Sequence, residues 1–169
     1  MTVLTTERLS LRQVCAADAE FIRELLNEPA FLQNIGDRGV RSPEDAARYI
    51  EDRMCASYRE HGFGLYLVER KADVVAVGIC GFVRRDFLED VDIGFAFLER
   101  YWSQGYAFEA ASAVMEYGRT ALGLRRILAI TAAENPASIR LLGKLGLHFE
   151  GMIVVPGTPA PSRLFQLEA

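Results

Sequence analysis

A short segment at residues 102–107, Trp-Ser-Gln-Gly-Tyr-Ala, has the composition of an anion-binding turn. It follows an apolar stretch typical of a strand and leads into good helix formers. The first N–H groups of a helix have no intrahelical partner and carry a partial positive charge, so they attract phosphate without a basic side chain. Gly105 and Ala107 keep the backbone accessible. The pattern predicts a pyrophosphate at a helix start, although such turns often serve only as connections.

Other phosphate and metal sites lack their usual residues. No Gly-x-Gly-x-x-Gly follows the first predicted strand and no Gly-Lys-Ser or Gly-Lys-Thr occurs, which argues against nicotinamide and nucleoside triphosphate chemistry. Cys15, Cys55 and Cys80 are few and widely spaced, so we expect three buried thiols. His61 and His148 are isolated as well. We therefore expect no metal.

Length and composition limit the class of protein. The 169 residues fit one domain, which we expect to span 1–169, and 50% hydrophobic with 25% charged residues is typical of a globular chain. The net charge of -4 and the lack of a basic run argue against nucleic acid as a partner. With no signal-like N-terminus and no apolar run of about 18 residues, we expect a cytoplasmic protein without a membrane contact. A mildly acidic surface suits a cationic acceptor such as an amine.

Hydrophobic periodicity predicts a mixed α/β sheet, antiparallel in its first half and parallel where a helix connects two strands. Leu9 and Leu11 alternate with polar residues in a first strand, and a helix over about 17–26 follows and is ended by Pro29. Ser42 and Pro43 announce a second helix. Further strands are expected at 65–69, 74–83, 91–98, 126–131, 149–154 and 164–167, with helices at 107–121 and 137–145.

Three segments together resemble a known family. Residues 93–97, Ile-Gly-Phe-Ala-Phe, followed by 101–107 and by Glu109-Ala110, resemble the acetyl-CoA-binding core of the GNAT N-acetyltransferases. Trp102, where that superfamily often has Arg or Gln, resembles the RimJ/RimL branch, as do residues 6–12, Thr-Glu-Arg-Leu-Ser-Leu-Arg, and 135–138, Asn-Pro-Ala-Ser. The resemblance spans nearly the whole chain. It implies the GNAT fold, a central, mostly antiparallel sheet flanked by helices, with acetyl-CoA as co-substrate.

The resemblance also implies a set of donor-binding residues. The backbone at 95–97 would run alongside pantetheine, and the 102–107 turn would hold the pyrophosphate. Asn135 would bond the amide region of pantetheine, while Ser138 and Leu142 would line the thiol end. The predicted donor site is Phe95, Ala96, Phe97, Trp102, Ser103, Gln104, Gly105, Tyr106, Ala107, Asn135, Ser138 and Leu142.

Acetyl transfer to an amine needs a base and a proton for the departing thiolate. Asp92 is the candidate base, because period-2 alternation places it on one face with Gly94 and Ala96; a surface aspartate or an ion pair is the alternative, and Glu150 is a weaker candidate. Many members of the superfamily resemble one another in having a tyrosine seven positions after the asparagine, where this chain has Leu142. Ser138 can bond the sulfur or a bridging water, or serve only as a helix cap.

The polar loop at 34–41 lies between the first two predicted helices, where enzymes of this fold shape the acceptor pocket. Asn34, Asp37 and Arg38 are the candidate substrate residues: the aspartate can attract an amine, whereas Arg38 and Arg41 can hold a carboxylate or the loop itself.

We expect an acetyl-CoA-dependent N-acetyltransferase that modifies a primary amine, on a protein N-terminus or a small molecule, by direct attack in a ternary complex. A non-catalytic acyl-CoA-binding or sensing module and a ligand-free interaction domain are the alternatives. The sequence leaves the oligomeric state open, and a homodimer is compatible with it.

Overall fold

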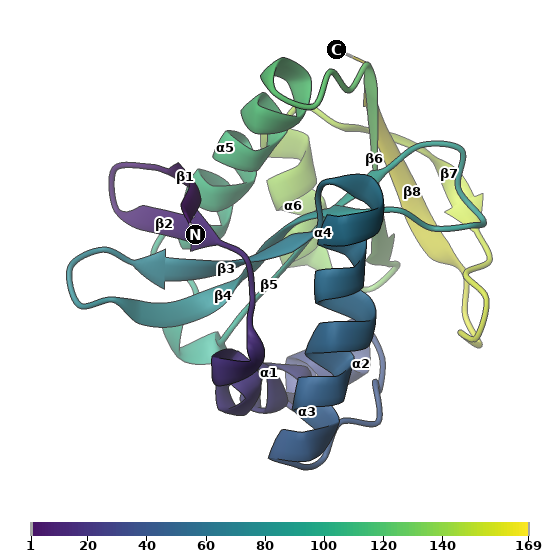
Figure 1. The fold of residues 1–169 in the computed structure, drawn as a ribbon. Coiled ribbons are helices and arrows are strands. Elements are labelled where there is room, and N and C mark those ends of the chain that lie inside the picture. Colours follow the sequence, from purple (N-terminus) through teal and green to yellow (C-terminus); the bar gives the residue numbers. More distant parts are fainter. Residues whose placement is uncertain (1, 169) are drawn as a thin grey trace.

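The structure, a computed structural model that describes residues 2–168, contains one eight-stranded sheet in the order β1-β2-β3-β4-β5-β6-β8-β7 (Figure 1). Neighbours are antiparallel except β5 and β6, which the helix α5 connects. The expected mixed, mostly antiparallel sheet is therefore confirmed. The strands are β1 (Thr2–Thr5), β2 (Leu9–Arg12), β3 (Leu65–Arg70), β4 (Val75–Val83), β5 (Asp92–Phe97), β6 (Arg126–Ala132), β7 (His148–Ile153) and β8 (Ser162–Glu168).

Helices cover both faces of the sheet (Figure 1). α5 (Tyr106–Thr120) and α6 (Pro136–Lys144) pack on one face, where Ala110, Val114 and Leu142 join a core with the apolar side chains of the strands. α1 (Ala19–Leu26), α2 (Pro29–Asn34) and α3 (Pro43–Tyr49) cover the other face with a second core. The remaining helical segments are η1 (Ala16–Asp18), η2 (Ile50–Cys55), α4 (Ala56–His61) and η3 (Glu99–Tyr101).

Three local expectations were wrong or incomplete. Pro29 does not end the first helix, since α1 stops at Leu26 and Pro29 takes the first position of α2, where a missing N–H leaves no bond unmade. The strand β1 was not predicted, because its four residues lie at an edge of the sheet and bury little. Of the three cysteines only Cys80 is buried; Cys15 is exposed and Cys55 half-buried.

The two edges of β5 differ, and this difference creates the site. All six residues of β5 pair with β4, but only Asp92 pairs with β6, opposite Leu128. The Leu128 N–H donates to the Val91 carbonyl at 2.9 Å, and beyond that point the described strands share no further pairing. We call the space between residues 93–97 of β5 and 129–132 of β6 the wedge.

The described residues contain no helix long and apolar enough to cross a membrane. Within 2–168 there is also no group of three or more His, Cys, Asp or Glu side chains placed to hold a metal ion.

Candidate active site

The 102–107 turn leads from η3 into the first two residues of α5 and has an unusual backbone. Gly105 has φ +83° and Ser103 has φ +62°, so two of its residues adopt the left-handed region that favours glycine. A Cβ built on Gly105 would lie 3.2 Å from Nη2 of Arg8. The turn therefore favours a glycine at 105 on two grounds, its φ angle and the guanidinium packed against it.

The N–H groups of this turn are free to bind an anion. Among the described residues, no backbone N–H from 103 to 108 donates to a protein acceptor, and Glu109 N–H makes the first bond of α5, to the Gly105 carbonyl. These donors lie at the positive end of a helix of 15 residues. The arrangement suits a phosphate or pyrophosphate group.

The wedge exposes a second set of backbone donors. The Leu98 N–H donates to Val77 on β4, so alternation directs the N–H and C=O groups of Phe97 and Phe95 toward β6 and into the wedge. The Phe97 carbonyl accepts a bond from Nε1 of Trp102 at 2.8 Å. The half-exposed indole thus joins the open edge of β5 to the turn.

Side chains on β5 alternate between the two cores as the sequence predicted. Phe95 and Phe97 pack on the α5 side, and Ala96 packs on the α1–α3 side, the face that Asp92 and Gly94 share by alternation. Ala107, in the first turn of α5, is partly buried against the same core as Phe95. The predicted donor residues of β5 and of the 102–107 turn are thus brought to one end of the wedge.

Asp92 lies where the wedge begins, and its side chain is only 2% exposed. Burial raises the pKa of Asp92 to about 6, while Nε of Arg85, which donates to its Oδ1 at 2.8 Å, acts in the opposite direction. The sequence alternative of an ion pair is therefore present together with burial. Arg85, in the β4–β5 connection, was not predicted, because nothing in its sequence context links it to Asp92.

The predicted site residues that follow β6, Asn135, Ser138 and Leu142, differ in exposure and in hydrogen bonding. Asn135 caps α6, with its Oδ1 accepting from the Ser138 N–H at 3.3 Å, so the cap is the asparagine and not the serine. The Ser138 hydroxyl makes no hydrogen bond to another described residue. Leu142 is 1% exposed and lies in the core beneath α6.

The acceptor-side residues are less concentrated. Asn34 is the last residue of α2, and Asp37 is exposed and bonded to Arg41, with 2.5 Å between the carboxylate Oδ2 and Nη2. This bond and one from the Gly39 N–H hold the pKa of Asp37 below its usual value. Arg38 is exposed and lines a hollow with residues of α3 and η2. Glu150 is exposed on β7, which β6 and β8 separate from β5 in the sheet.

Cys80 and Cys15 differ in burial and in their place in the fold. Cys80 is fully buried, and burial raises the pKa of its thiol well above the ordinary value, which disfavours the thiolate. Cys15 is exposed and precedes η1, on the segment between β2 and α1. Neither has the environment of a covalent nucleophile.

Comparisons with known proteins agree with this geometry. The acetyltransferase (GNAT) domain model matches residues 8–148. An uncharacterized N-acetyltransferase, YoaA of Bacillus subtilis, is 32% identical over 98% of this chain and 96% of its own. A GNAT acetyltransferase structure from Bacillus anthracis has a TM-score of 0.82 at 26% identity, covering 99% of this chain and 98% of that one.

The fold is also that of a structure containing coenzyme A. RimL, a ribosomal L7/L12 alpha-N-protein acetyltransferase in complex with coenzyme A, has a TM-score of 0.83 at 18% identity and covers 99% of this chain and 98% of its own. At that identity the likeness concerns the fold. From the family match and the relative from Bacillus subtilis, this chain belongs to the GNAT family of N-acetyltransferases.

Proposed function

We propose that residues 1–169 act as one unit that transfers the acetyl group of acetyl-CoA to a primary amine by direct attack in a ternary complex. The observation that carries the proposal is the single pairing between β5 and β6. It leaves main-chain donors open along one strand edge that leads directly to the 102–107 turn. Membership of the GNAT family and of its fold supports the choice of acetyl-CoA.

The donor is bound mainly by backbone. The N–H groups of residues 103–107 hold its pyrophosphate, and the open edge of β5 at 95–97 runs beside pantetheine. A free N–H on this edge, at Phe95 or a neighbour of the same orientation, polarises the thioester carbonyl. Trp102 fixes the edge through its bond to Phe97, and Asn135 contributes its amide from the cap of α6.

Asp92 is the proposed base, acting on the amine directly or through a water molecule. It lies at the apex of the wedge, so a group bound between the two strands lies next to it in the sheet. Its pKa of about 6 leaves the carboxylate mostly ionised at neutral pH, yet basic enough to accept a proton. Arg85 holds the carboxylate in place.

Ser138 is the proposed partner of the departing thiolate. Its hydroxyl has no other bond within the described residues, and the cap made by Asn135 fixes the first turn of α6 on which it stands. It donates to the sulfur or to a water molecule bound there. Leu142, one helical turn further along, closes the apolar side of this region.

The acceptor approaches from the α1–α3 side, because Asp92 faces that side of the sheet. Asn34, Asp37 and Arg38 are the proposed contacts. Asp37 already binds Arg41, so an amine would have to compete with that guanidinium, whereas Arg38 has no ion-pair partner among the described residues. RimL acts on a protein alpha-amine, as its name states, and we place this chain in the RimJ/RimL-like branch with a protein N-terminus as the first acceptor to test.

The experiment is a thiol-release screen with acetyl-CoA over peptide N-termini and small amines. We expect release of CoA together with a product heavier by one acetyl group for at least one acceptor class. Asp92→Asn serves as the matched control, because it keeps the shape of the side chain and removes the base. Binding of acetyl-CoA without turnover on any acceptor would instead indicate an acyl-CoA sensor, and no binding of acetyl-CoA at hundreds of micromolar would refute the proposal.

A further inference from the structure

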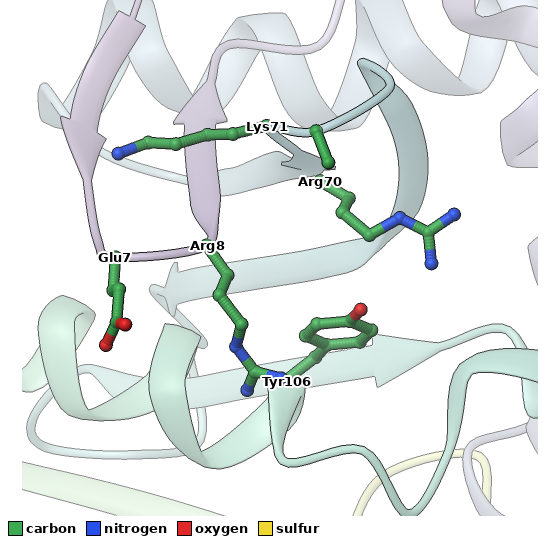
Figure 2. A pocket seen from close by; sticks show the side chains of 6 residues that line it. Glu7, Arg8, Arg70, Lys71 and Tyr106 are labelled. Carbon is green, nitrogen blue, oxygen red and sulfur yellow. The ribbon is translucent and has the colours of Figure 1, made fainter.

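The segment 6–12, which resembles the RimJ/RimL branch, contains none of the residues proposed to bind acetyl-CoA or to catalyse the transfer. In the structure its first residues form the β1–β2 turn, which lies against the start of α5. Thr6 and Arg8 of this segment contact Glu109, about one hundred positions later in the chain. Figure 2 shows Arg8 extending from the strand turn to Tyr106, across a hollow lined by Glu7, Arg70, Lys71 and Ala72.

Glu109 accepts three hydrogen bonds from the β1–β2 turn. Its Oε1 accepts from Arg8 Nε at 2.7 Å, and its Oε2 accepts from the Arg8 backbone N–H at 2.9 Å and from the Thr6 hydroxyl. Partial burial acts to raise the pKa of Glu109, but these bonds outweigh it and hold the pKa below its ordinary value. The carboxylate is therefore ionised, and its oxygens accept hydrogen bonds from the protein itself.

Arg8 contacts three consecutive residues of the donor turn, Gln104, Gly105 and Tyr106. Its Nη1 donates to the Gln104 carbonyl at 2.9 Å, its Nη2 packs against Gly105, and its guanidinium carbon lies 4.5 Å from the ring centre of Tyr106. One planar side chain thus spans the residue before the glycine, the glycine and the first residues of α5. Arginine can do this because its five donors are fixed in one plane.

The turn needs such support. Ser103 and Gly105 have positive φ angles, which for serine is a strained conformation that persists only where the surroundings hold it. Of the other hollow-lining cations, Arg70 binds Asp73 and lies over the Tyr101 ring, and Lys71 Nζ donates to the Thr6 carbonyl. The bonds of Arg8 and Glu109 therefore tie the turn and the start of α5 to the β1–β2 turn, while the bond of Trp102 to Phe97 ties it to β5.

We propose that Arg8 and Glu109 are positioning residues for the donor, which hold the 102–107 turn in the shape that presents its N–H groups to the pyrophosphate of acetyl-CoA. This inference rests on the proposed function. It assigns to the Thr6–Arg8 segment a role in donor affinity, exerted through the turn and without contact with the reacting atoms.

If Glu109 acted on the donor only through its charge, Glu109→Gln should have the opposite effect on affinity. Glu109 carries a negative charge in the first turn of α5, close to where an anion binds, so removing that charge should strengthen anion binding if charge alone mattered. If Glu109 positions the turn, its removal should instead weaken binding of the donor. In Glu109→Gln one of the two terminal atoms becomes a donor and faces Arg8 Nε, so the three bonds cannot all be made.

The test measures the Kd of acetyl-CoA by isothermal titration calorimetry for Glu109→Gln and Arg8→Lys. We expect each Kd to rise about tenfold, the effect of losing one charge-assisted hydrogen bond. Lysine keeps the charge of Arg8 but cannot span Gln104 and Glu109 together. In steady-state kinetics the KM of acetyl-CoA rises, while kcat at saturating donor stays near the wild-type value.

Glu116→Gln is the matched control, because Glu116 binds Arg119 on the same helix about two turns further along. Its donor Kd should stay within about twofold, as for exposed ion pairs. An unchanged or lower Kd in Glu109→Gln overturns the inference, provided that circular dichroism shows a folded protein; if that variant does not fold, an unchanged Kd in the more exposed Arg8→Lys overturns it. Absence of binding in the wild type would instead refute the proposed function.

Discussion

The 102–107 turn and the loop at 35–42 are both polar connections, but the protein holds them in different ways. Arg8 braces the turn from a position 96 residues before Gln104 and 101 before Glu109. The loop is held by residues near it in the chain: Arg41 binds Asp37 four positions earlier and Asn27 at the end of α1, and the Gly39 N–H binds the Asp37 carboxylate. The turn is thus fixed by contacts from distant strands, whereas the Arg41–Asp37 pair at the tip of the loop is exposed and can break at little cost in stability. This contrast suits an enzyme with a fixed donor and a variable acceptor.

The largest expected effect comes from Asp92. This residue belongs to neither region, so its substitution tests the chemical step and not the binding of the donor. Asp92→Asn should lower kcat about a hundredfold or more, the range for loss of a general base. In the wild type, activity should rise with pH through an apparent pKa near 6, as the carboxylate loses its proton, and this limb should be absent in the variant. A pH–rate profile at saturating substrates measures both. A residual profile that keeps the limb near pH 6 would exclude Asp92 as the base.

Asp92 should also make the free energy of unfolding depend on pH. Because the folded protein holds the Asp92 proton more tightly than the unfolded chain, whose value is about 3.8, this residue stabilises the fold most below pH 4. That contribution is lost as pH rises to about 6 and amounts to about 3 kcal/mol. Urea unfolding should show that the free energy of unfolding of the wild type, taken relative to that of Asp92→Asn, is lower at pH 7 than at pH 4.

Gly105→Ala tests the rigidity of the turn. The new Cβ would meet Arg8 Nη2 at 3.2 Å and alanine is strained at φ +83°, so we expect the Kd of acetyl-CoA to rise about tenfold. Gly123→Ala is the control: its φ is +68°, but no atom lies within 4 Å of its added Cβ. Both variants should lose similar stability in thermal melts, and only the first should lose affinity. Equal affinities for the two would show that the turn tolerates a side chain.

Ser138→Ala should affect turnover instead of donor affinity. If the serine hydroxyl assists the thiolate, kcat should fall about tenfold with little change in donor affinity, as for one hydrogen bond to a charged group. The fold should tolerate the change, because Asn135 and not Ser138 caps α6. Stopped-flow measurement of thiol release at several pH values tests this, and an unchanged rate would leave water as the proton donor.

The sequence predicted most of the fold, because apolar alternation and helical spacing report directly on burial. It placed the strands around 65–98 and the helix after Gly105 within one or two residues of their observed bounds. Pro29 was misassigned because proline is equally suited to follow one helix and to begin the next. The edge strand β1 escaped prediction because four partly exposed residues carry little periodicity.

The site was predictable where a motif is local and not where contacts are long-range. The 102–107 turn and Asp92 each stand out within a few residues of sequence. The contact of Arg8 with Glu109 joins residues 101 positions apart, and the open edge of β5 arises from strand pairing, which no single residue encodes. Arg85 next to Asp92 required the course of the β4–β5 connection to be known.

The smallest expected effect concerns the loop at 35–42, whose residue Asp37 is a proposed contact of the acceptor. Asp37→Asn removes the partner of Arg41 and leaves the braced turn untouched, so the Kd of acetyl-CoA should stay at the wild-type value. The KM of an amine acceptor should change by no more than about fivefold, as expected for an exposed ion pair. Its direction is informative: an increase means that the carboxylate attracts the amine, and a decrease means that the freed Arg41 recruits an acidic acceptor. A change in donor affinity would contradict the separation of the two regions.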